Sequence, residues 1–220
     1  MARGGKTVRG RATAARIVTA ATRLFVEHGY VNTTMAAIAD EAGVAVQTLY
    51  LAFGSKAAIL AEVHDRAVIG TAENIPVLEQ PWVDQVRAEA DGLRALWLVM
   101  DNGLAISERV APVYEKIQTA AADTEVADLL AKVRMQRLHT VRELTAILAT
   151  KAGFAPDTTD RAADILYALV SVEVYHLLVV ERGWTPNDWK AWAINDAARC
   201  LFPDTTAPDP TSQGESEAMT

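Results

Sequence analysis

The stretch from Thr33 to Phe53, TTMAAIADEAGVAVQTLYLAF, decides the fold that we expect of this chain. A threonine precedes Met35 and can cap a short helix, which the apolar spacing predicts to end at Gly43. A second helix of similar length is predicted to follow and to end at Phe53. A steep crossing of two short helices needs a left-handed backbone position, which glycine adopts without steric cost. The stretch therefore has the dimensions of a helix-turn-helix, although a helical hairpin inside a core shows the same pattern.

Further helices are predicted on either side of this pair. Between Arg11 and His28 the apolar residues recur at the spacing of one helix face, which leaves the charged residues outside that face. The apolar positions are Ile17, Ala21, Leu24 and Phe25. Gly29 is expected to stop this helix. On the other side, Ser55 can cap a helix that continues to about Gly70.

The segment from Gly29 to Val44, followed by Thr48-Leu49-Tyr50 and Phe53-Gly54-Ser55-Lys56, resembles the N-terminal domain of the TetR family of regulators. The match covers roughly residues 12–66. The resemblance implies an all-α protein in which an N-terminal three-helix helix-turn-helix domain joins a C-terminal helical ligand-binding and dimerisation domain. It also implies a homodimer that binds double-stranded DNA, with repression as a family-level expectation.

The resemblance assigns three residues to the phosphates of DNA. Thr34 lies where the family's second helix is capped and meets a phosphate, and the free N–H groups of a helix N-terminus suit an anion. Tyr50 and Lys56 match the family's tyrosine and lysine phosphate contacts. Such contacts fix the register of a protein on DNA without reading its sequence.

The first turn of the second helix of the pair, the recognition helix, carries the residues expected to face the bases. These residues are Ala45, Val46, Gln47 and Thr48. Gln47 is the best candidate for reading a base, because its amide can pair with N6 and N7 of adenine. Ala45 and Val46 can contact a thymine methyl group.

Two departures from the family's usual pattern lie close by. Ala45 stands where a serine or threonine commonly opens the recognition helix, so a cap worth about 1 kcal/mol is lost and packing must hold the helix. Ala57 and Ala58 stand where acids commonly follow the Ser-Lys pair. The second change removes negative charge near the DNA backbone and is harmless to binding.

The charge of the chain is distributed unevenly. Residues 1–66 carry 8 Lys and Arg against 5 Asp and Glu, whereas residues 67–220 carry 13 against 23. The first acid is Glu27, and the basic residues before it could lie along a polyanion. We expect residues 1–10 to form a flexible basic arm, which either follows the DNA or binds nothing specific.

The domain boundaries follow from these patterns and from the glycines and prolines downstream. Residues 11–66 are predicted as the DNA-binding domain and residues 67–203 as the ligand-binding and dimerisation domain. Helices are expected at about 82–102, 103–121, 124–152, 158–182 and 187–202. The tail at 204–220 is rich in Pro, Thr, Ser and acids and is expected to be disordered.

The last two predicted helices are candidates for the dimer interface. In the TetR family the last two helices form a four-helix bundle with those of the second subunit. The helix at 160–182 is apolar on more than one face, which exceeds what one monomer's core needs. A buried monomer core is the competing interpretation. The most apolar part, Ile165 to Val180, is shorter than the roughly 20 residues of a membrane span, so we expect a buried helix.

Candidates for an effector pocket lie on the middle helices, where aromatic surface and a few polar groups occur together. We single out Trp97, Asp101, Tyr114 and His139. The expected effector is small and largely apolar. Each of these residues could instead be an ordinary core residue, and the regulator could instead respond to a protein partner or to no effector.

Other classes of function find little support in the sequence. The four histidines are far apart and the single Cys200 has no partner, so we expect no metal site and no cofactor. No nucleophile elbow, dinucleotide fingerprint or phosphate loop is present, so we expect no enzyme. No export signal is visible and one cysteine fits a reducing compartment, so we expect a cytoplasmic location.

Overall fold

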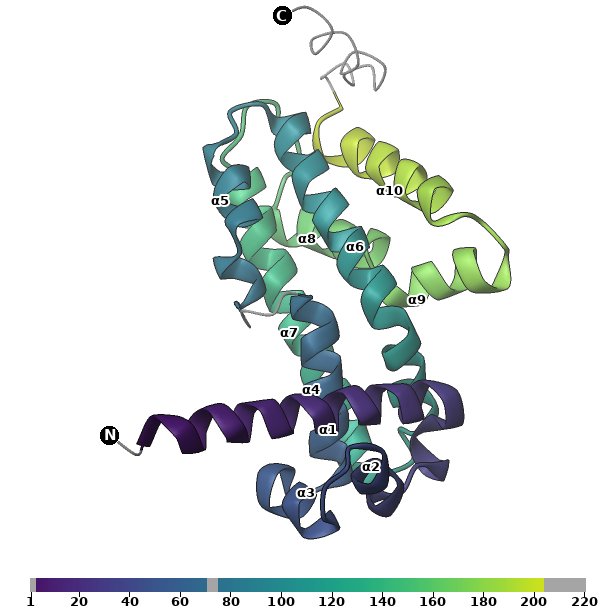
Figure 1. Cartoon of the computed structure of the whole chain (residues 1–220). Helices are drawn as coiled ribbons and strands as arrows, with labels where there is room; N and C mark the ends of the chain where they lie inside the picture. Colours follow the sequence, from purple (N-terminus) through teal and green to yellow (C-terminus); the bar gives the residue numbers. More distant parts are fainter. Residues whose placement is uncertain (1–2, 71–74, 204–220) are drawn as a thin grey trace, which may run out of the picture. The chain divides into compact units, whose positions relative to one another are not determined.

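The computed structural model describes residues 3–70 and 75–203, which are helical with short connections (Figure 1). No strand occurs among these residues, so the predicted all-α class is confirmed. The α-helices are α1 (Arg3–Asn32), α2 (Met35–Glu41), α3 (Val46–Phe53), α4 (Lys56–Ile69), α5 (Pro81–Ala88), α6 (Gly92–Thr119), α7 (Thr124–Leu148), α8 (Thr159–Leu169), α9 (Val172–Tyr175) and α10 (Pro186–Leu201). A 3-10 turn, η1 (Val77–Glu79), and a π-helical turn, η2 (His176–Glu181), complete the set.

The chain forms two compact units. The first unit contains the residues up to Ile75 together with Ile106–Gln136, and the second contains Pro76–Ala105 and the residues from Arg137 onward. The helices α6 and α7 therefore contribute residues to both units. The first unit holds more than the predicted segment 11–66, because the two ends of α6 and α7 that meet near residue 120 belong to it.

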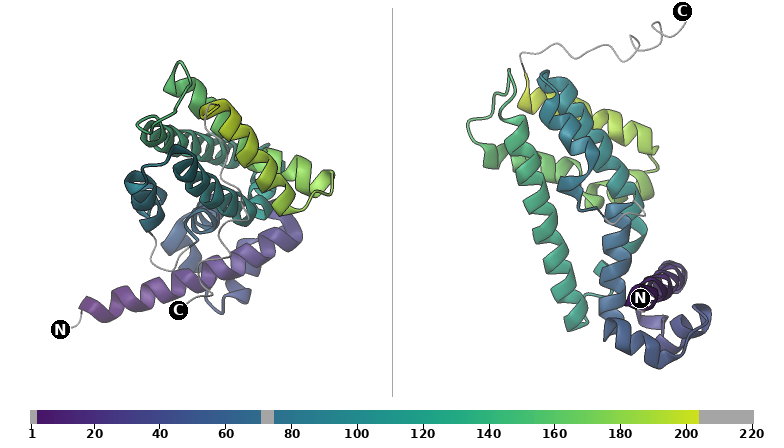
Figure 2. Two further views of the ribbon diagram at one scale, coloured as in Figure 1. Left: turned by 90° about the horizontal axis from the view of Figure 1, so that it is seen from above. Right: turned by 60° about the vertical axis from the view of Figure 1, so that its left-hand side comes forward.

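The core of the first unit forms where α1 packs against α4 and α2, and α2 against α3 (Figure 2). The predicted apolar face of α1 is confirmed, since Ile17, Ala21, Leu24 and Phe25 are all buried. The other helices supply Ile38, Leu49, Ile59, Leu60 and Val63. Complete burial of such a side chain contributes about 1.5–3 kcal/mol, which is how helices of only seven and eight residues are held.

The caps predicted around the two short helices are present. The Oγ1 atom of Thr34 accepts a hydrogen bond of 3.1 Å from the backbone N–H of Ala37. The Oγ atom of Ser55 likewise accepts one of 3.2 Å from the N–H of Ala58. Gly43 has the expected left-handed backbone, with φ 62°. These local signals position the recognition helix α3.

The two ends of α1 differ in how well they were predicted. At Gly29 the backbone turns to φ 79°, so the predicted stop is present as a kink within the assigned helix. At the other end the backbone is helical from Arg3 onward, where a flexible arm over residues 1–10 was predicted. Arginine and lysine favour helices and no proline interrupts the segment, whereas its three glycines disfavour a helix. The disordered tail predicted at 204–220 lies outside the described residues.

The predicted break between helices at 102 and 103 is wrong. The chain breaks at Glu89–Asp91 instead, where the Asp91 carboxylate accepts a hydrogen bond of 2.8 Å from the N–H of Arg94 and caps α6. The helix α6 then continues through Gly103 and Pro112. A Cβ atom on Gly103 would make an ordinary contact with Val170 at 3.6 Å, so packing does not require a glycine here, and this glycine does not end the helix.

The predicted helix at 158–182 is interrupted. The segment α8 ends at Leu169, and Ser171 starts the next turn by accepting a hydrogen bond of 3.0 Å from the N–H of Val174. The chain continues through α9 into the π-helical turn η2. By length and composition, the stretch 159–181 is the one candidate membrane span found among the described residues, and only 33% of its most apolar window is buried. The stretch predicted as a buried helix, Ile165 to Val180, is therefore only partly buried within one protomer.

The last helix, α10, packs on α8 (Figure 2). One of its indole rings is buried. The ring of Trp189 is 1% exposed and meets the ring of Tyr175 edge-on, with 5.0 Å between centroids. The helix α10 begins at Pro186, with Thr185 and Asp188 forming a capping box. A hydroxyl followed three residues later by a carboxylate satisfies two backbone N–H groups at once, so the helix begins one residue before the predicted start at 187.

Candidate nucleic-acid interface

The recognition helix α3 is held from one side and exposed on the other. Leu49 is fully buried and anchors the helix in the core of the first unit. Ala45, Val46 and Gln47 are exposed, and Thr48 is half-buried. Ala45 starts the helix without a side-chain hydrogen bond, so the predicted loss of a cap is confirmed. The structure thus presents the turn predicted to read bases to solvent.

Leu51 is a member of this face that the sequence analysis missed. Its side chain is 83% exposed, although leucine prefers burial. It lies four residues after Gln47 on the same helix, so the two side chains share one face. The helical spacing from Gln47 could have identified it. An exposed leucine beside the amide predicted to read a base adds apolar surface suited to a thymine methyl group.

A groove of about 650 Å³ lies beside α3, where the N-terminal residues of α2 and α4 also reach the surface. Polar side chains in its wall include those of Tyr30, Thr34, Tyr50, Lys56, Asp123 and Glu125. All three residues predicted to hold phosphates are among them. The structure therefore brings Thr34, Tyr50 and Lys56 to one place.

Lys56 is engaged with the backbone at the end of α1. Its Nζ atom donates hydrogen bonds to the carbonyl oxygens of Tyr30, at 2.8 Å, and Thr33, at 2.9 Å. The same ammonium lies 4.1 Å from the centroid of the Tyr30 ring. An ammonium has three protons, so one remains for a phosphate oxygen. The sequence did not predict this structural role.

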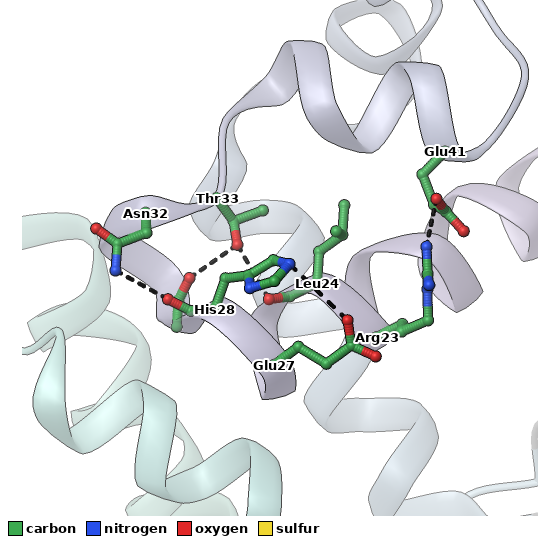
Figure 3. A network of polar contacts seen from close by, with 8 residues as sticks. Arg23, Leu24, Glu27, His28, Asn32, Thr33 and Glu41 are labelled. Carbon is green, nitrogen blue, oxygen red and sulfur yellow. Dashed lines mark hydrogen bonds and ion pairs between the residues drawn. The ribbon is translucent and has the colours of Figure 1, made fainter.

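The chain segment that receives Lys56 is itself fixed by Thr33. This threonine is buried. Its hydroxyl donates a hydrogen bond to the carbonyl oxygen of Gly29 at 2.8 Å, and the carbonyl oxygen of Leu24 is a second acceptor at 3.2 Å (Figure 3). On a neighbouring part of α1, Arg23 forms an ion pair with Glu41 of α2 (Figure 3). The segment between α1 and α2 is therefore tied to α1 by Thr33, and the end of α2 is tied to α1 by Arg23.

Two carboxylates also face the groove from outside the helix-turn-helix. Asp123 and Glu125 flank the start of α7 and belong to the first unit. Burial, followed by the charges of Asp123 and Glu125, raises the pKa of Tyr30 to about 12. Burial lowers the pKa of Lys56, and the charge of Asp123 opposes this shift. No acidic residue was predicted from the sequence to line this groove.

Comparison with known families agrees with this geometry. Residues 17–63 match the model of the bacterial regulatory proteins of the tetR family. Over these residues, the chain is a member of the TetR family. The matched segment contains α2 and α3 with their caps, so the helix-turn-helix of this TetR-family regulator is a DNA-binding element.

Solved structures share the fold of this TetR-family chain at low sequence identity. NalD, the secondary repressor of the MexAB-OprM multidrug efflux pump in Pseudomonas aeruginosa, is 20% identical, with a TM-score of 0.65 over 89% of this chain and 99% of its own. A proposed transcriptional regulator from Saccharomonospora viridis in complex with choline is 22% identical, with a TM-score of 0.63 over 86% and 96%. The fatty acid degradation regulator FadR from Bacillus halodurans is 20% identical, with a TM-score of 0.64 over 84% and 94%. A search of curated proteins finds no match.

Of the four predicted effector contacts, Tyr114 belongs to the first unit, and Trp97, Asp101 and His139 belong to the second. Trp97 is half-exposed, and the Nζ atom of Lys190 lies 5.3 Å from its ring centroid. Asp101 forms an ion pair with the same Lys190, so these two residues share a partner. Tyr114 is buried in the first unit, where its hydroxyl accepts a hydrogen bond of 3.1 Å from Arg134. The side chain of His139 is exposed beside Glu143.

A half-buried guanidinium in the second unit was not predicted. Arg137 donates a hydrogen bond of 2.9 Å to Glu173 and lies 4.2 Å from the ring centroid of Tyr167. Burial on its own would lower the pKa of Arg137, but Glu173 and Tyr167 raise it overall. This ion pair joins α7 to α9. In the part of the chain that the structure describes, no group of three or more His, Cys, Asp or Glu residues could hold a metal.

Proposed function

We propose that this TetR-family regulator is a homodimeric repressor, which binds a near-palindromic operator and leaves it when a small, largely apolar effector binds. The observation that carries the proposal is the exposed first turn of α3 beside a groove containing Thr34, Tyr50 and Lys56. A short exposed helix next to hydroxyl and ammonium donors suits the major groove and its flanking phosphates.

The proposed contacts divide by what they recognise. Thr34, Tyr50 and the third proton of Lys56 bind phosphates and position the protein. In the exposed turn, Gln47 reads an adenine, and its neighbours Ala45, Val46 and Thr48 complete the contact with the bases. The hydroxyl of Thr34 caps α2 as an acceptor and therefore still has a proton to donate.

The proposed dimer interface consists of the last two helical segments, α8 to η2 and α10. Large apolar side chains remain exposed on this part of the protomer, namely Leu177, Val180 and Trp184. Their exposure favours coverage by a second copy, because large apolar patches on soluble proteins usually mark interfaces. A twofold dimer presents two α3 helices and therefore requires a near-palindromic site.

The proposed effector is a small, largely apolar molecule. A related fold holds choline in the Saccharomonospora viridis structure, which supports a small-molecule site in this architecture. Trp97, Asp101, Tyr114 and His139 remain the proposed contacts, and the single free Cys200 is compatible with a cytoplasmic location.

The experiment is selection of bound fragments from random duplex DNA, repeated with candidate small molecules. The proposal expects a palindromic consensus and an effector that lowers operator affinity. By linkage, the operator must lower effector affinity by the same factor, typically 5- to 150-fold. If no small molecule shifts operator binding, the proposed effector is ruled out. The regulator then responds to a protein partner or has no effector. Alanine at all four proposed contacts with an undiminished response would remove those contacts.

A further inference from the structure

The turn between α6 and α7 brings negative charge to the wall of the DNA-binding groove. Asp123 and Glu125 line the same groove as Lys56 and Tyr50, although they lie more than 60 residues away in sequence. Both acids are exposed, and neither forms an ion pair with a residue that the structure describes. Their charge is therefore left facing the position proposed for a phosphate.

We propose that Asp123 and Glu125 lower the affinity of the protein for DNA from outside the helix-turn-helix, by opposing the phosphate that Thr34, Tyr50 and Lys56 would hold. The inference rests on the proposed phosphate contacts. It assigns to the α6–α7 turn a part in setting how tightly the regulator holds any duplex.

Asp123 is fixed in place by the start of α7. One of its carboxylate oxygens accepts hydrogen bonds from the N–H groups of Glu125, at 2.9 Å, and Val126, at 3.4 Å. The side chain thus caps the helix and cannot swing freely away from the groove. Its charge adds to the rise that burial causes in the pKa of Tyr30 and opposes the fall that burial causes in the pKa of Lys56.

The expected effect is moderate and depends on salt. Exposed charges about 10 Å apart interact weakly in water, so removing both should tighten binding by roughly three- to tenfold. Salt screens such interactions over about 8 Å at physiological ionic strength, so the gain should shrink as salt rises. Phosphates carry no sequence information, so operator and random duplex should gain equally.

The test compares the variants Asp123→Asn, Glu125→Gln and their combination with Asp128→Asn. Asparagine caps helices as well as aspartate does, so the first variant keeps the start of α7. Asp128 is an exposed acid of α7 outside the groove lining, and its variant matches the single variants in charge. Affinities for a selected operator and for random duplex of equal length are measured at about 50 and 200 mM salt. Thermal melts confirm that each variant is folded.

The expected result is tighter binding of both duplexes by the groove variants, largest for the combination at low salt, and less than a twofold change for Asp128→Asn. If the groove variants match Asp128→Asn, or bind DNA more weakly while melting normally, the inference is overturned and the proposed DNA contacts stand. If the unaltered protein binds no duplex, both the inference and the proposed contacts fail.

Discussion

The ammonium of Lys56 is bound to the carbonyl oxygen of Thr33 at 2.9 Å, so a residue predicted to grip DNA also closes the end of α1. Thr34, the next residue, caps α2 and lines the groove. One lysine thus connects the fold of the first unit to its proposed contact with phosphate. Loss of Lys56 should therefore affect both stability and DNA binding.

Lys56→Ala should lower the free energy of unfolding by about 1–2 kcal/mol, because two carbonyl oxygens lose a charged donor at a half-buried site. It should also weaken binding to operator and random DNA alike. The slope of the logarithm of the binding constant against the logarithm of salt concentration should fall in magnitude by about 1 per lost phosphate contact. Denaturant titration and salt-dependent binding measure the two effects. Tyr50→Phe is the control, because its exposed hydroxyl can be removed with stability unchanged while DNA binding weakens. Equal stability losses in both variants would contradict this division.

Ala45→Ser should stabilise the protein by about 0.5–1 kcal/mol. Residue 45 already has the extended backbone of an N-cap, with φ −71° and ψ 144°, and no side-chain acceptor for α3. A serine oxygen supplies that acceptor. Thermal unfolding measures the gain, and Ala45→Val serves as a control that adds atoms without an acceptor. A melting temperature unchanged by serine would show that packing alone satisfies the start of α3.

Gln47→Ala should cost about 1–3 kcal/mol of operator binding and relax selection at one base pair in each half-site. The exposed amide has no structural role in the first unit, so the melting temperature should not change. The effect is measured by the affinities of both proteins for the operator and for operators altered at one base pair at a time. An equal loss on random duplex would mean that Gln47 reads no base.

Val180→Glu should convert the dimer to monomers. Val180 is 59% exposed in one protomer, so the protomer tolerates the charge, whereas a dry interface between copies does not. Sedimentation at micromolar concentration measures the mass. Met135→Glu, at another exposed apolar residue (68%), should stay dimeric. A dimeric Val180→Glu variant would place the interface elsewhere.

The helix-turn-helix was predictable because its signals are local. Thr34, Gly43 and Ser55 each act on their immediate neighbours in sequence, and each is where the pattern predicted. The position of the turn predicted to read bases followed from the same spacing. The predicted domain boundary after residue 66 and the individual contacts stay predictions.

The body was less predictable because its breaks depend on packing between distant residues. Gly103 lies inside α6 beside Val170, whereas the sequence rule treats a glycine as the end of a helix. The approach of Asp123 to the groove likewise depends on how α6 and α7 meet in the first unit. Helical periodicity carries no information on either contact.

The measurement that tests the central claim most directly is the affinity of the purified protein for duplex DNA as a function of salt. We predict binding that weakens steeply as salt rises, and selected fragments with two half-sites about one helical turn, or a multiple of it, apart. No salt-sensitive affinity for any duplex would contradict the account.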